Sequence, residues 1–451
     1  MKSIGAVVLS LLLAATGAAQ AQGFRIPDDV RENVWARVNN GWSTGIVIGV
    51  VDSTGARYFG YGKTAADGQP VNERTVYEIG SITKVFTALT LAEMAIHGEV
   101  GLDDPVQRYL SDSVHVPSRD GKEITLRLLS AKRSGLPRMP GNFAPANQDN
   151  PFADYSSVQL YAFLNGYTLT RDPGASYEYS NLGVGLLGLA LARRSGTSYE
   201  DMVLQRVIGP LRMRDTRKTL TPDMSARLAH GHAGGREVSN WDINLLAGAG
   251  ALRSTAQDLA RFVAAAAGLV STPLDSAFRL TEAVEFDAGP TMHIGLGWHV
   301  AGADTSMAWW HNGGTGGYHS FIGFDPRRKI GVVVLSNDAS SIDDIGFHLL
   351  RPSAPLATVR VAIAMPAESL EAYAGTYQLA PTFALTIRRE GAGLVAQATG
   401  QGANAIYPSA KDEFFFKVVE AQISFVRDST GKVISLVLHQ NGRDLPAPRT
   451  P

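Results

Sequence analysis

The chain has 451 residues, of which 45% are hydrophobic and 18% charged, and its formal net charge is −1. The length predicts two or three domains with sizeable cores, and the near-neutral charge gives no electrostatic reason to expect a nucleic-acid partner. The complete lack of cysteine excludes disulfides, cysteine-ligated zinc, iron–sulfur clusters and a cysteine nucleophile.

The first 21 residues are typical of a secretory signal peptide. Lys2 supplies a short positive segment, and residues 4–19 form an apolar stretch that is too short to span a bilayer well. Ala19-Gln20-Ala21 has small residues at the spacing of a cleavage site, which predicts cleavage before residue 22. The alternative is an uncleaved membrane anchor. We expect an exported protein without a stable membrane anchor, periplasmic if the source is Gram-negative.

The first half of the chain predicts a hairpin followed by helices. Apolar runs on both sides of the turn 52–55 predict a hairpin over 45–62. Residues 81–97 are apolar almost all round, which predicts a buried helix. From about 102 to 245 the pattern is helical but interrupted, and the loop 138–155 is long enough to indicate a functional role.

Strand patterns return in the second half. A capping box at 254–257 predicts the start of a helix, and residues 294–336 are typical of strands, including the buried run 330–335. Strands joined by hairpin-length turns pair antiparallel. We therefore expect an antiparallel sheet flanked by helices, interrupted in sequence by the helical insert 102–245. This fold class is α/β of the α+β kind.

The C-terminal residues differ in character. The stretch 351–365 contains two prolines and is expected to be a linker. Over 366–451, short segments alternate apolar and polar residues between turns, which predicts a small all-β barrel or sandwich. We therefore expect a main domain over 22–350, then the linker and the small β domain.

Ser81 and Lys84 form the first candidate catalytic pair. At positions i and i+3 of a helix, a serine hydroxyl and a lysine amine share one face. A helix N-terminus also offers N–H groups to a developing oxyanion, and burial favours a neutral lysine that could accept the serine proton. The pattern alone is weak, because it recurs at 429–432 in a predicted β-turn. An N-cap serine beside a snorkelling lysine is the structural alternative.

Two further motifs carry possible chemistry. Tyr179-Ser180-Asn181 is the only Tyr-x-Asn among 14 tyrosines, and its phenol could relay a proton while its amide holds a substrate carbonyl. The glycine-rich stretch 311–317 follows an aromatic strand, and its glycines would let a substrate backbone approach the strand edge closely. The structural alternatives are a tyrosine at a helix start and a glycine-rich turn with a surface histidine.

Together these motifs resemble those of the class C β-lactamase and DD-peptidase superfamily of serine hydrolases. The likeness covers about 24–350 and extends to four flanking segments, 77–81, 102–106, 134–137 and 248–252. It implies a β-lactamase/transpeptidase-like fold and an acyl-enzyme mechanism that needs no metal or organic cofactor. The C-terminal residues, which open with 370–377, are similar to the lipocalin-like module often appended to this family.

The resemblance also implies roles for particular residues. Ser81 would be the acylated nucleophile and Lys84 its general base. Tyr179 would be the second base and proton relay, and Asn181 would orient the substrate amide. The backbone N–H groups of Ser81 and Gly314 would form the oxyanion hole.

The third motif departs from the family pattern. His311, Asn312 and Gly313 would contact substrate, but class C β-lactamases have Lys-Thr-Gly there, and that lysine helps to hold a substrate carboxylate. A neutral histidine would hold it more weakly, and its charge depends on pH. His-x-Gly variants occur among D-amino-acid peptidases, DD-peptidases of peptidoglycan recycling and family VIII carboxylesterases. Two smaller departures are Lys132-Arg133, where His-Thr is frequent, and Thr83, where serine or alanine is usual.

The function implied is that of an exported serine hydrolase acting on β-lactams or on D-Ala-type peptide amide bonds. Its partner would be a small-molecule or peptidoglycan-peptide substrate. Two alternatives use the same site: a family VIII-type carboxylesterase, and a penicillin-binding sensor that is acylated without turnover.

Two other motifs are interpreted as incidental. His230-Gly231-His232 lacks a further ligand at metal-binding spacing and is expected on a surface loop. The segment 41–45 matches Gly-x-Ser-x-Gly, but a strand is predicted after it where a nucleophile elbow needs a helix. We therefore do not expect an α/β-hydrolase.

Overall fold

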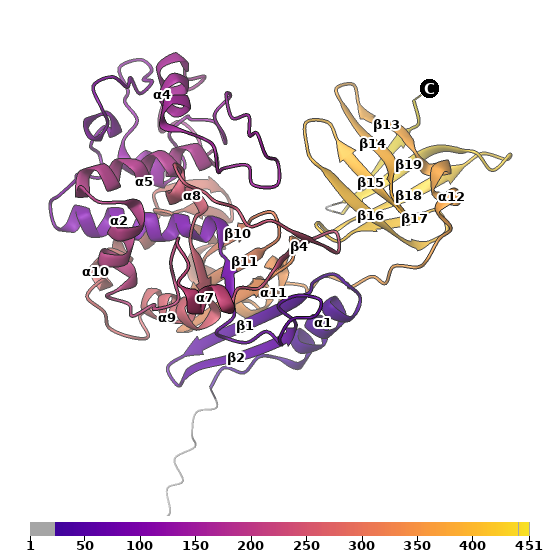
Figure 1. The fold of residues 1–451 in the computed structure, drawn as a ribbon, viewed down its shortest axis with the longest axis horizontal. Coiled ribbons are helices and arrows are strands. Elements are labelled where there is room, and N and C mark those ends of the chain that lie inside the picture. Colours follow the sequence, from indigo (N-terminus) through magenta and orange to yellow (C-terminus); the bar gives the residue numbers. More distant parts are fainter. Residues whose placement is uncertain (1–22, 441, 451) are drawn as a thin grey trace, which may run out of the picture.

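The computed structural model describes residues 23–440 and 442–450, so the predicted signal peptide lies outside the described residues. Within this part of the chain, no helix is long and apolar enough to cross a membrane. Figure 1 shows a large mixed α and β body, coloured indigo to orange, beside a smaller all-β body in yellow.

An eight-stranded antiparallel sheet forms the centre of the large body. Its order is β2-β1-β12-β11-β10-β9-β8-β7, so strands from the two ends of the region are neighbours. The strands are β1 (Gly45–Asp52), β2 (Gly55–Gly62), β7 (Phe286–Gly289), β8 (Met292–Ile294), β9 (His299–Ala301), β10 (Ala308–Gly314), β11 (His319–Asp325) and β12 (Ile330–Ser336). The predicted hairpin and antiparallel sheet are confirmed.

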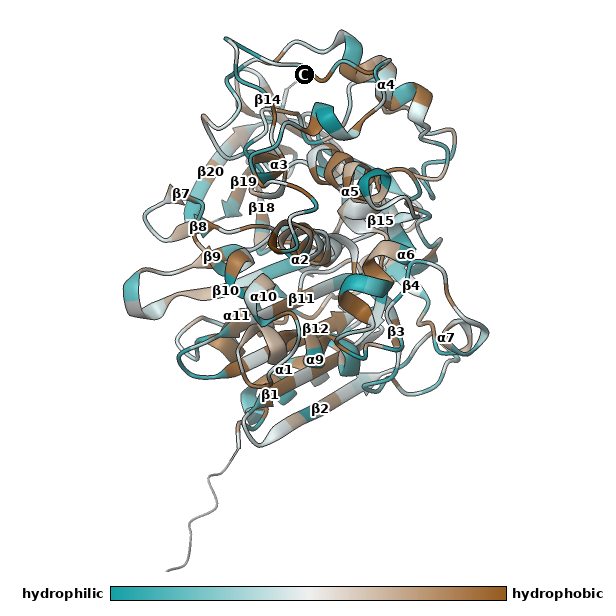
Figure 2. Ribbon diagram, turned by 90° about the vertical axis from the view of Figure 1, so that its left-hand side faces the viewer, coloured by the Kyte–Doolittle hydropathy of each residue, from teal (hydrophilic) through white to brown (hydrophobic). Residues whose placement is uncertain are grey.

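Helices cover both faces of this sheet because alternate strand residues point to opposite sides. Ile46 and Ile48 of β1 pack with residues of α1 (Asp28–Asn39) and α11 (Asp343–Leu350). Val47 and Val51 belong to the core on the other face, which includes α2 (Thr83–Ile96), α9 (Ala256–Ala266) and α10 (Asp275–Glu282). In Figure 2, α2 lies near the middle of the molecule and is largely brown, as expected for a helix buried all round.

The insert between β2 and β7 also holds further helices and helical turns, several of which pack against α2 or α5. They are the 3-10 turns η1 (Gly80–Ile82) and η2 (Val106–Tyr109), the π turn η3 (Leu204–Ile208), and α3 (Leu126–Ser130), α4 (Ser157–Gly166), α5 (Asn181–Ser195), α6 (Tyr199–Val203), α7 (Pro222–Ala226) and α8 (Ala247–Gly250). The helix predicted from residue 81 therefore starts as the 3-10 turn η1 and continues as α2. A further 3-10 turn, η4 (Asp304–Ser306), precedes β10.

Two details of the insert differ from the sequence prediction. A hairpin of β4 (Gly231–Ala233) and β5 (Arg236–Val238) interrupts the expected helical region, because Gly234 and Gly235 adopt positive φ values of 58° and 77° at its turn. The helix α9 is capped by Thr255, not by Ser254. Ser254 lies in β6 (Arg253–Thr255), which pairs with β3 (Val76–Glu78), and its hydroxyl contacts Thr216.

The small body is an eight-stranded antiparallel barrel. After α12 (Ala367–Leu370) and the 3-10 turn η5 (Glu371–Tyr373) come β13 (Gly375–Ala380), β14 (Phe383–Glu390), β15 (Gly393–Ala398), β16 (Ala403–Ala410), β17 (Glu413–Phe416), β18 (Ala421–Arg427), β19 (Val433–Gln440) and β20 (Arg443–Pro448), in that spatial order. Thr450 N donates to Thr376 O, which links the two edges. The predicted all-β barrel is confirmed, and the Ser429–Lys432 motif lies in its β18–β19 turn.

The segment 41–45 joins the two bodies. The ring of Trp42 stacks on Phe415 of β17 at 5.7 Å, and its indole N–H donates to Arg360 O at 2.9 Å. Lys417 Nζ donates to Gly41 O at 2.8 Å. The Gly-x-Ser-x-Gly match is therefore a docking segment followed by strand β1, and its serine is buried beside Ser336.

Candidate active site

Ser81 lies at the N-terminal end of α2, where the chain runs close to strand β10. Gly80 has a φ of +47°, and a Cβ built on it would lie only 2.8 Å from Gly314 N. A Cβ on Gly313 would lie 2.9 Å from Ser81 N. Glycine at these positions therefore lets the two backbones approach each other, and it places Ser81 N and the β10 edge side by side.

Lys84 is fully buried one turn after Ser81. Its Nζ lies 2.9 Å from Ser81 Oγ, 2.8 Å from Asn181 Oδ1 and 2.7 Å from Ala249 O. Burial lowers the pKa of Lys84 well below its usual value, and the charges of Lys132 and Arg138 lower it further. A neutral Lys84 can donate to the amide and carbonyl oxygens while its lone pair accepts the Ser81 hydroxyl proton.

The Tyr-x-Asn motif leads into α5 on the opposite side of Ser81. Ser180 caps this helix by accepting from Gly183 N at 2.8 Å, which leaves Asn181 at the first helical position facing Lys84. Burial raises the pKa of Tyr179 to about 12, while the Ser81 hydroxyl and Arg138 act in the other direction. Tyr179 therefore holds its proton at neutral pH unless a neighbouring cation assists its release.

Three basic side chains surround the Tyr179 ring. Lys84 Nζ lies 4.8 Å, Arg138 Cζ 5.0 Å and Lys132 Nζ 5.8 Å from its centroid. Each lies within the range in which a cation is attracted to an aromatic face. They also lower the energy of any negative charge that develops on the phenol oxygen.

Gly314 contributes a backbone N–H on the edge of β10. Thr315 N donates to Tyr318 O, so the adjacent pair Gly314–His319 is a non-hydrogen-bonded pair of the β10–β11 ladder. The N–H of Gly314 therefore points away from β11. With Ser81 N nearby, this arrangement offers two backbone donors to an oxyanion.

The third-motif side chains are not free to bind substrate directly. His311 is fully buried, and its Nδ1 lies 2.6 Å from Asn312 O, which makes Nδ1 the protonated nitrogen. Burial lowers the pKa of His311 well below its usual value, so the ring is neutral. Asn312 donates to Asp343 at 2.6 Å, and the same carboxylate contacts His319 at 2.9 Å.

A cavity of about 570 Å³ opens beside Ser81. Its wall brings together five of the residues predicted from sequence besides the serine: Tyr179, Asn181, Asn312, Gly313 and Gly314. Lys84 and His311 lie behind this wall. Residues that the motifs did not identify complete the lining, among them Arg138, Met139, Phe143, Phe152, Trp241 and His299.

One group of the missed residues had a sequence signal. Arg138, Phe143 and Phe152 belong to the long loop expected to be functional, and Phe152 packs on Trp241 at 5.3 Å. Glu78 holds the Trp241 segment, since its Oε1 accepts from Trp241 N at 3.0 Å and also from Arg253. Trp241 had no local signal, because only the folded chain brings it to Ser81.

The histidine pair at 230–232 is not a surface loop as expected. His232 lies buried on β4, with Nδ1 3.2 Å from Asn337 O, whereas His230 is exposed and pairs with Glu237 at 2.9 Å. Among the residues 23–440 and 442–450, no group of three potential ligands is arranged to hold a metal ion.

Comparison with known proteins gives matches over both bodies. Residues 30–349 match the family described as Beta-lactamase, and residues 359–447 match a Domain of unknown function (DUF3471). The chain is 26% identical over 364 residues to a Beta-lactamase of Escherichia coli, covering 73% of this chain and 93% of the relative. It is 29% identical over 310 residues to the D-alanyl-D-alanine-carboxypeptidase/endopeptidase AmpH of the same species, covering 65% and 79%.

A solved structure shares the fold of the large body. The Beta-lactamase/D-alanine Carboxypeptidase from Yersinia pestis matches with a TM-score of 0.61 at 24% identity, covering 69% of this chain and 92% of that one. The Beta-lactamase match spans more than half of the chain and includes the Ser81, Lys84 and Tyr179 cluster described above. The chain therefore belongs to the β-lactamase family of serine hydrolases.

Proposed function

We propose that the protein cleaves the amide bond of β-lactams or of D-alanyl peptides through an acyl-enzyme on Ser81. The observation that carries this proposal is the contact of 2.9 Å between Ser81 Oγ and the fully buried Lys84 Nζ. Two relatives support the substrate class, one named a Beta-lactamase and one a D-alanyl-D-alanine-carboxypeptidase/endopeptidase.

In the proposed acylation, neutral Lys84 takes the proton of Ser81 as Oγ bonds to the substrate carbonyl carbon. The oxyanion of the tetrahedral intermediate accepts hydrogen bonds from Ser81 N and Gly314 N. The carbon–nitrogen bond then breaks, and the leaving nitrogen takes a proton from the Tyr179 phenol, which regains one from the Lys84 ammonium. In the second half-reaction, water attacks the ester carbonyl carbon and its proton passes to the same two groups. The bond between that carbon and Ser81 Oγ then breaks, and Oγ regains its proton from Lys84.

Substrate recognition is proposed to use the cavity wall. Arg138 is exposed, and its guanidinium makes no ion pair among the described residues, so it is the cation that a substrate carboxylate would meet. The aromatic side chains Phe143, Phe152 and Trp241 would receive an apolar acyl group. Asn181 would orient the substrate amide next to Lys84.

The chain is further proposed to be exported, with cleavage after residue 21. The mature protein would comprise a hydrolase domain over 22–350, a linker over 351–365 and a β-barrel domain over 366–451. The apolar leader and the small residues at 19–21 support this processing. The periplasm is then the compartment in which peptidoglycan peptides and β-lactams would be met.

A carboxylesterase is the second candidate. The observation that favours it is the buried, neutral His311, which leaves the strand edge without the cation that binds a substrate carboxylate in lysine-bearing relatives. An esterase would tolerate this loss because its substrates carry no carboxylate beside the scissile bond.

Residues 22–451 mixed with a chromogenic cephalosporin, with colour and intact mass followed together, would test these proposals. Sustained colour with a transient adduct indicates a β-lactamase, and one stoichiometric burst with a lasting adduct indicates a DD-peptidase or sensor. No reaction with the cephalosporin, but rapid cleavage of p-nitrophenyl acetate, supports the esterase.

Ser81→Ala is expected to abolish every adduct and all turnover. Ser429→Ala is the matched control, because it removes the serine of the other Ser-x-x-Lys pattern in the barrel turn. Activity that survives in Ser81→Ala would refute the site assignment.

A further inference from the structure

Lys132 is a fully buried cation next to the candidate site that the mechanism above does not use. Its Nζ donates to Gly297 O at 2.9 Å and lies 3.4 Å from His299 Nε2. The nitrogen also lies 5.8 Å from the centroid of the Tyr179 ring, on which His299 stacks at 6.3 Å. Lys132 therefore lies close to the Tyr179 phenol, which is proposed to relay protons.

The backbone at Lys132 is held in an unusual conformation. Its φ is +58°, a left-handed value that a lysine rarely adopts. The segment is fixed by hydrogen bonds from Glu178 N to Lys132 O and from Gly174 N to Arg133 O, both 2.8 Å. The two adjacent basic side chains have different surroundings: Lys132 is buried, whereas the Arg133 guanidinium lies over the ring of Phe286. An outlier of this kind, held by its surroundings, points to a functional constraint.

Among the residues that the structure describes, no acid pairs with Lys132. The titratable groups nearest to it are Lys84 on α2, His299 on β9, His311 on β10 and Tyr179 before α5. Tyr177 contacts the same His299, and Arg138 lies over the same Tyr179 ring. His299 Nε2 is also 3.0 Å from Tyr177 OH. A lysine buried without a carboxylate is costly, and hydrophobic residues would be more stable there.

We propose that Lys132 is a positioning residue that supplies, from a different segment, the positive charge that the third motif lacks at His311. Its charge keeps Lys84 in the neutral form that accepts the serine proton, and it supports negative charge on Tyr179 as the proton is relayed. Lys132 acts through these two residues and does not touch the reacting atoms. This inference rests on the proposed function of Ser81, Lys84 and Tyr179.

The proposal gives a distinctive pH profile for acylation. Burial lowers the pKa of Lys132 to about 7, so its charge is lost as the pH rises above that value. The wild type is therefore expected to show an acid limb from protonation of Lys84 and a decline at higher pH as Lys132 becomes neutral.

Two variants separate an electrostatic role from a structural one. Lys132→Met keeps the length of the side chain and is expected to move the acid limb upward by about one pH unit, because Lys84 loses a neighbouring charge. It should also slow acylation at least tenfold and lose the decline at higher pH. Lys132→Arg keeps a permanent charge, so it should retain the acid limb and the rate but lose that decline. Lys122→Met, an exposed lysine paired with Asp172, is the control.

The first measurement is the acylation rate with the cephalosporin, or with p-nitrophenyl acetate if the cephalosporin does not react, between pH 5 and 10. An unchanged profile in Lys132→Met overturns the proposal. Equal loss in Lys132→Met and Lys132→Arg at every pH also overturns it, because that result indicates packing alone. Neither result affects the assignment of Ser81.

A second measurement needs no substrate. The pKa of Lys132 is lower in the folded state than in the unfolded state. At pH values between these two pKa values the unfolded state binds more protons, so the free energy of unfolding of the wild type rises with pH relative to that of Lys132→Met. Denaturant unfolding at pH 6, 7.5 and 9 should show the wild type less stable than Lys132→Met at pH 6, with a difference in unfolding free energy that becomes smaller as the pH rises. A difference in unfolding free energy that does not change with pH would contradict a buried charge at Lys132, whether or not a substrate is known.

Discussion

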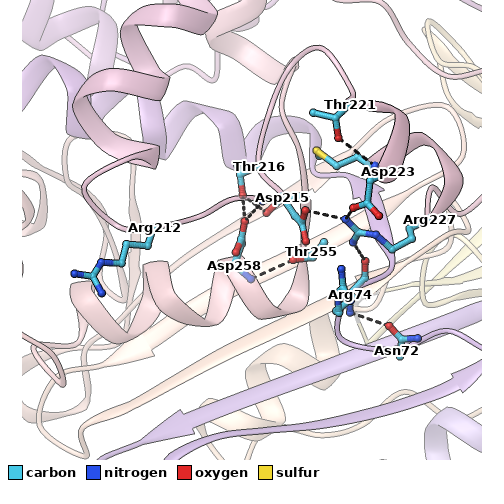
Figure 3. Close-up of polar contacts among 12 residues, drawn as sticks. Asn72, Arg74, Arg212, Asp215, Thr216, Thr221, Asp223, Arg227, Thr255 and Asp258 are labelled. Carbon is cyan, nitrogen blue, oxygen red and sulfur yellow. Dashed lines mark hydrogen bonds and ion pairs between the residues drawn. The ribbon is translucent and has the colours of Figure 1, made fainter.

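Two polar clusters at helix N-termini are built in opposite ways. Around Ser81 at the start of α2, the basic side chains Lys84, Lys132 and Arg138 lie together without an ion pair, and buried His299 Nδ1 and His311 Nε2 have no hydrogen-bond partner among the described residues. At the start of α9, shown in Figure 3, carboxylates pair with an arginine and accept hydrogen bonds from backbone and hydroxyl groups.

The α9 cluster is organised around Asp258. Thr255 Oγ1 caps the helix by accepting from Asp258 N at 3.2 Å, and the Asp258 carboxylate accepts from Asp215 N at 2.7 Å and Thr216 Oγ1 at 3.0 Å. Arg227 bridges Asp215 at 2.8 Å and Asp223 at 2.5 Å (Figure 3). The network pins the segment before α7 to α9.

The difference shows what each cluster contributes. Burial of basic groups without an acidic partner costs folding free energy, so the Ser81 cluster is stable only because the rest of the core holds it together. Burial of a paired and fully hydrogen-bonded acid holds segments in place. The Ser81 cluster is thus expected to serve catalysis and the Asp258 cluster to serve stability. Mutations in the two clusters should therefore affect activity and unfolding separately.

Lys84→Met should give the largest effect. Removal of the general base is expected to slow acylation on the order of 10³-fold, because positioned acid–base groups contribute 10²–10⁴-fold. The variant should unfold at the same temperature or higher, since a buried amine is replaced by a methionine of similar length. Burst kinetics and thermal unfolding measure the two effects. A variant that keeps its burst but melts early would make Lys84 a structural residue.

Asp258→Ala should do the reverse. It leaves Asp215 N without an acceptor and Arg261 without the carboxylate that it pairs with at 2.8 Å, which is expected to cost about 3 kcal/mol of unfolding free energy. Turnover per folded molecule should not change, because the cluster lies away from Ser81. Asp223→Ala is the control: its side chain is 70% exposed, and it removes an acid of the same network that pairs with Arg227. The control should lose less than about 1 kcal/mol.

The sequence predicted what local patterns encode. Ser81 and Lys84 share a helix face, and strand alternation with turns placed the hairpin 45–62, the sheet and the barrel. The cap of α9 was misplaced by one residue, because the end of β6 depends on its pairing with β3. No local pattern predicts that Lys132 is buried or that Trp241 and His299 line the cavity. These positions depend on contacts between residues more than 90 apart in sequence.

Arg138→Ala should have the smallest effect. It tests whether Arg138 binds the substrate carboxylate or acts by lowering the pKa of Lys84. Arg138 is exposed in the cavity, so its attraction for a substrate carboxylate is screened, and its loss is expected to raise KM about tenfold, which corresponds to about 1.4 kcal/mol. The rise should appear with the cephalosporin, which carries a carboxylate, and not with the neutral ester p-nitrophenyl acetate. Because Arg138 also lowers the pKa of Lys84, an equal loss of kcat with both substrates would instead assign it to tuning the base. The KM and kcat of the two substrates, measured side by side, therefore distinguish a cation that binds substrate from one that acts through Lys84.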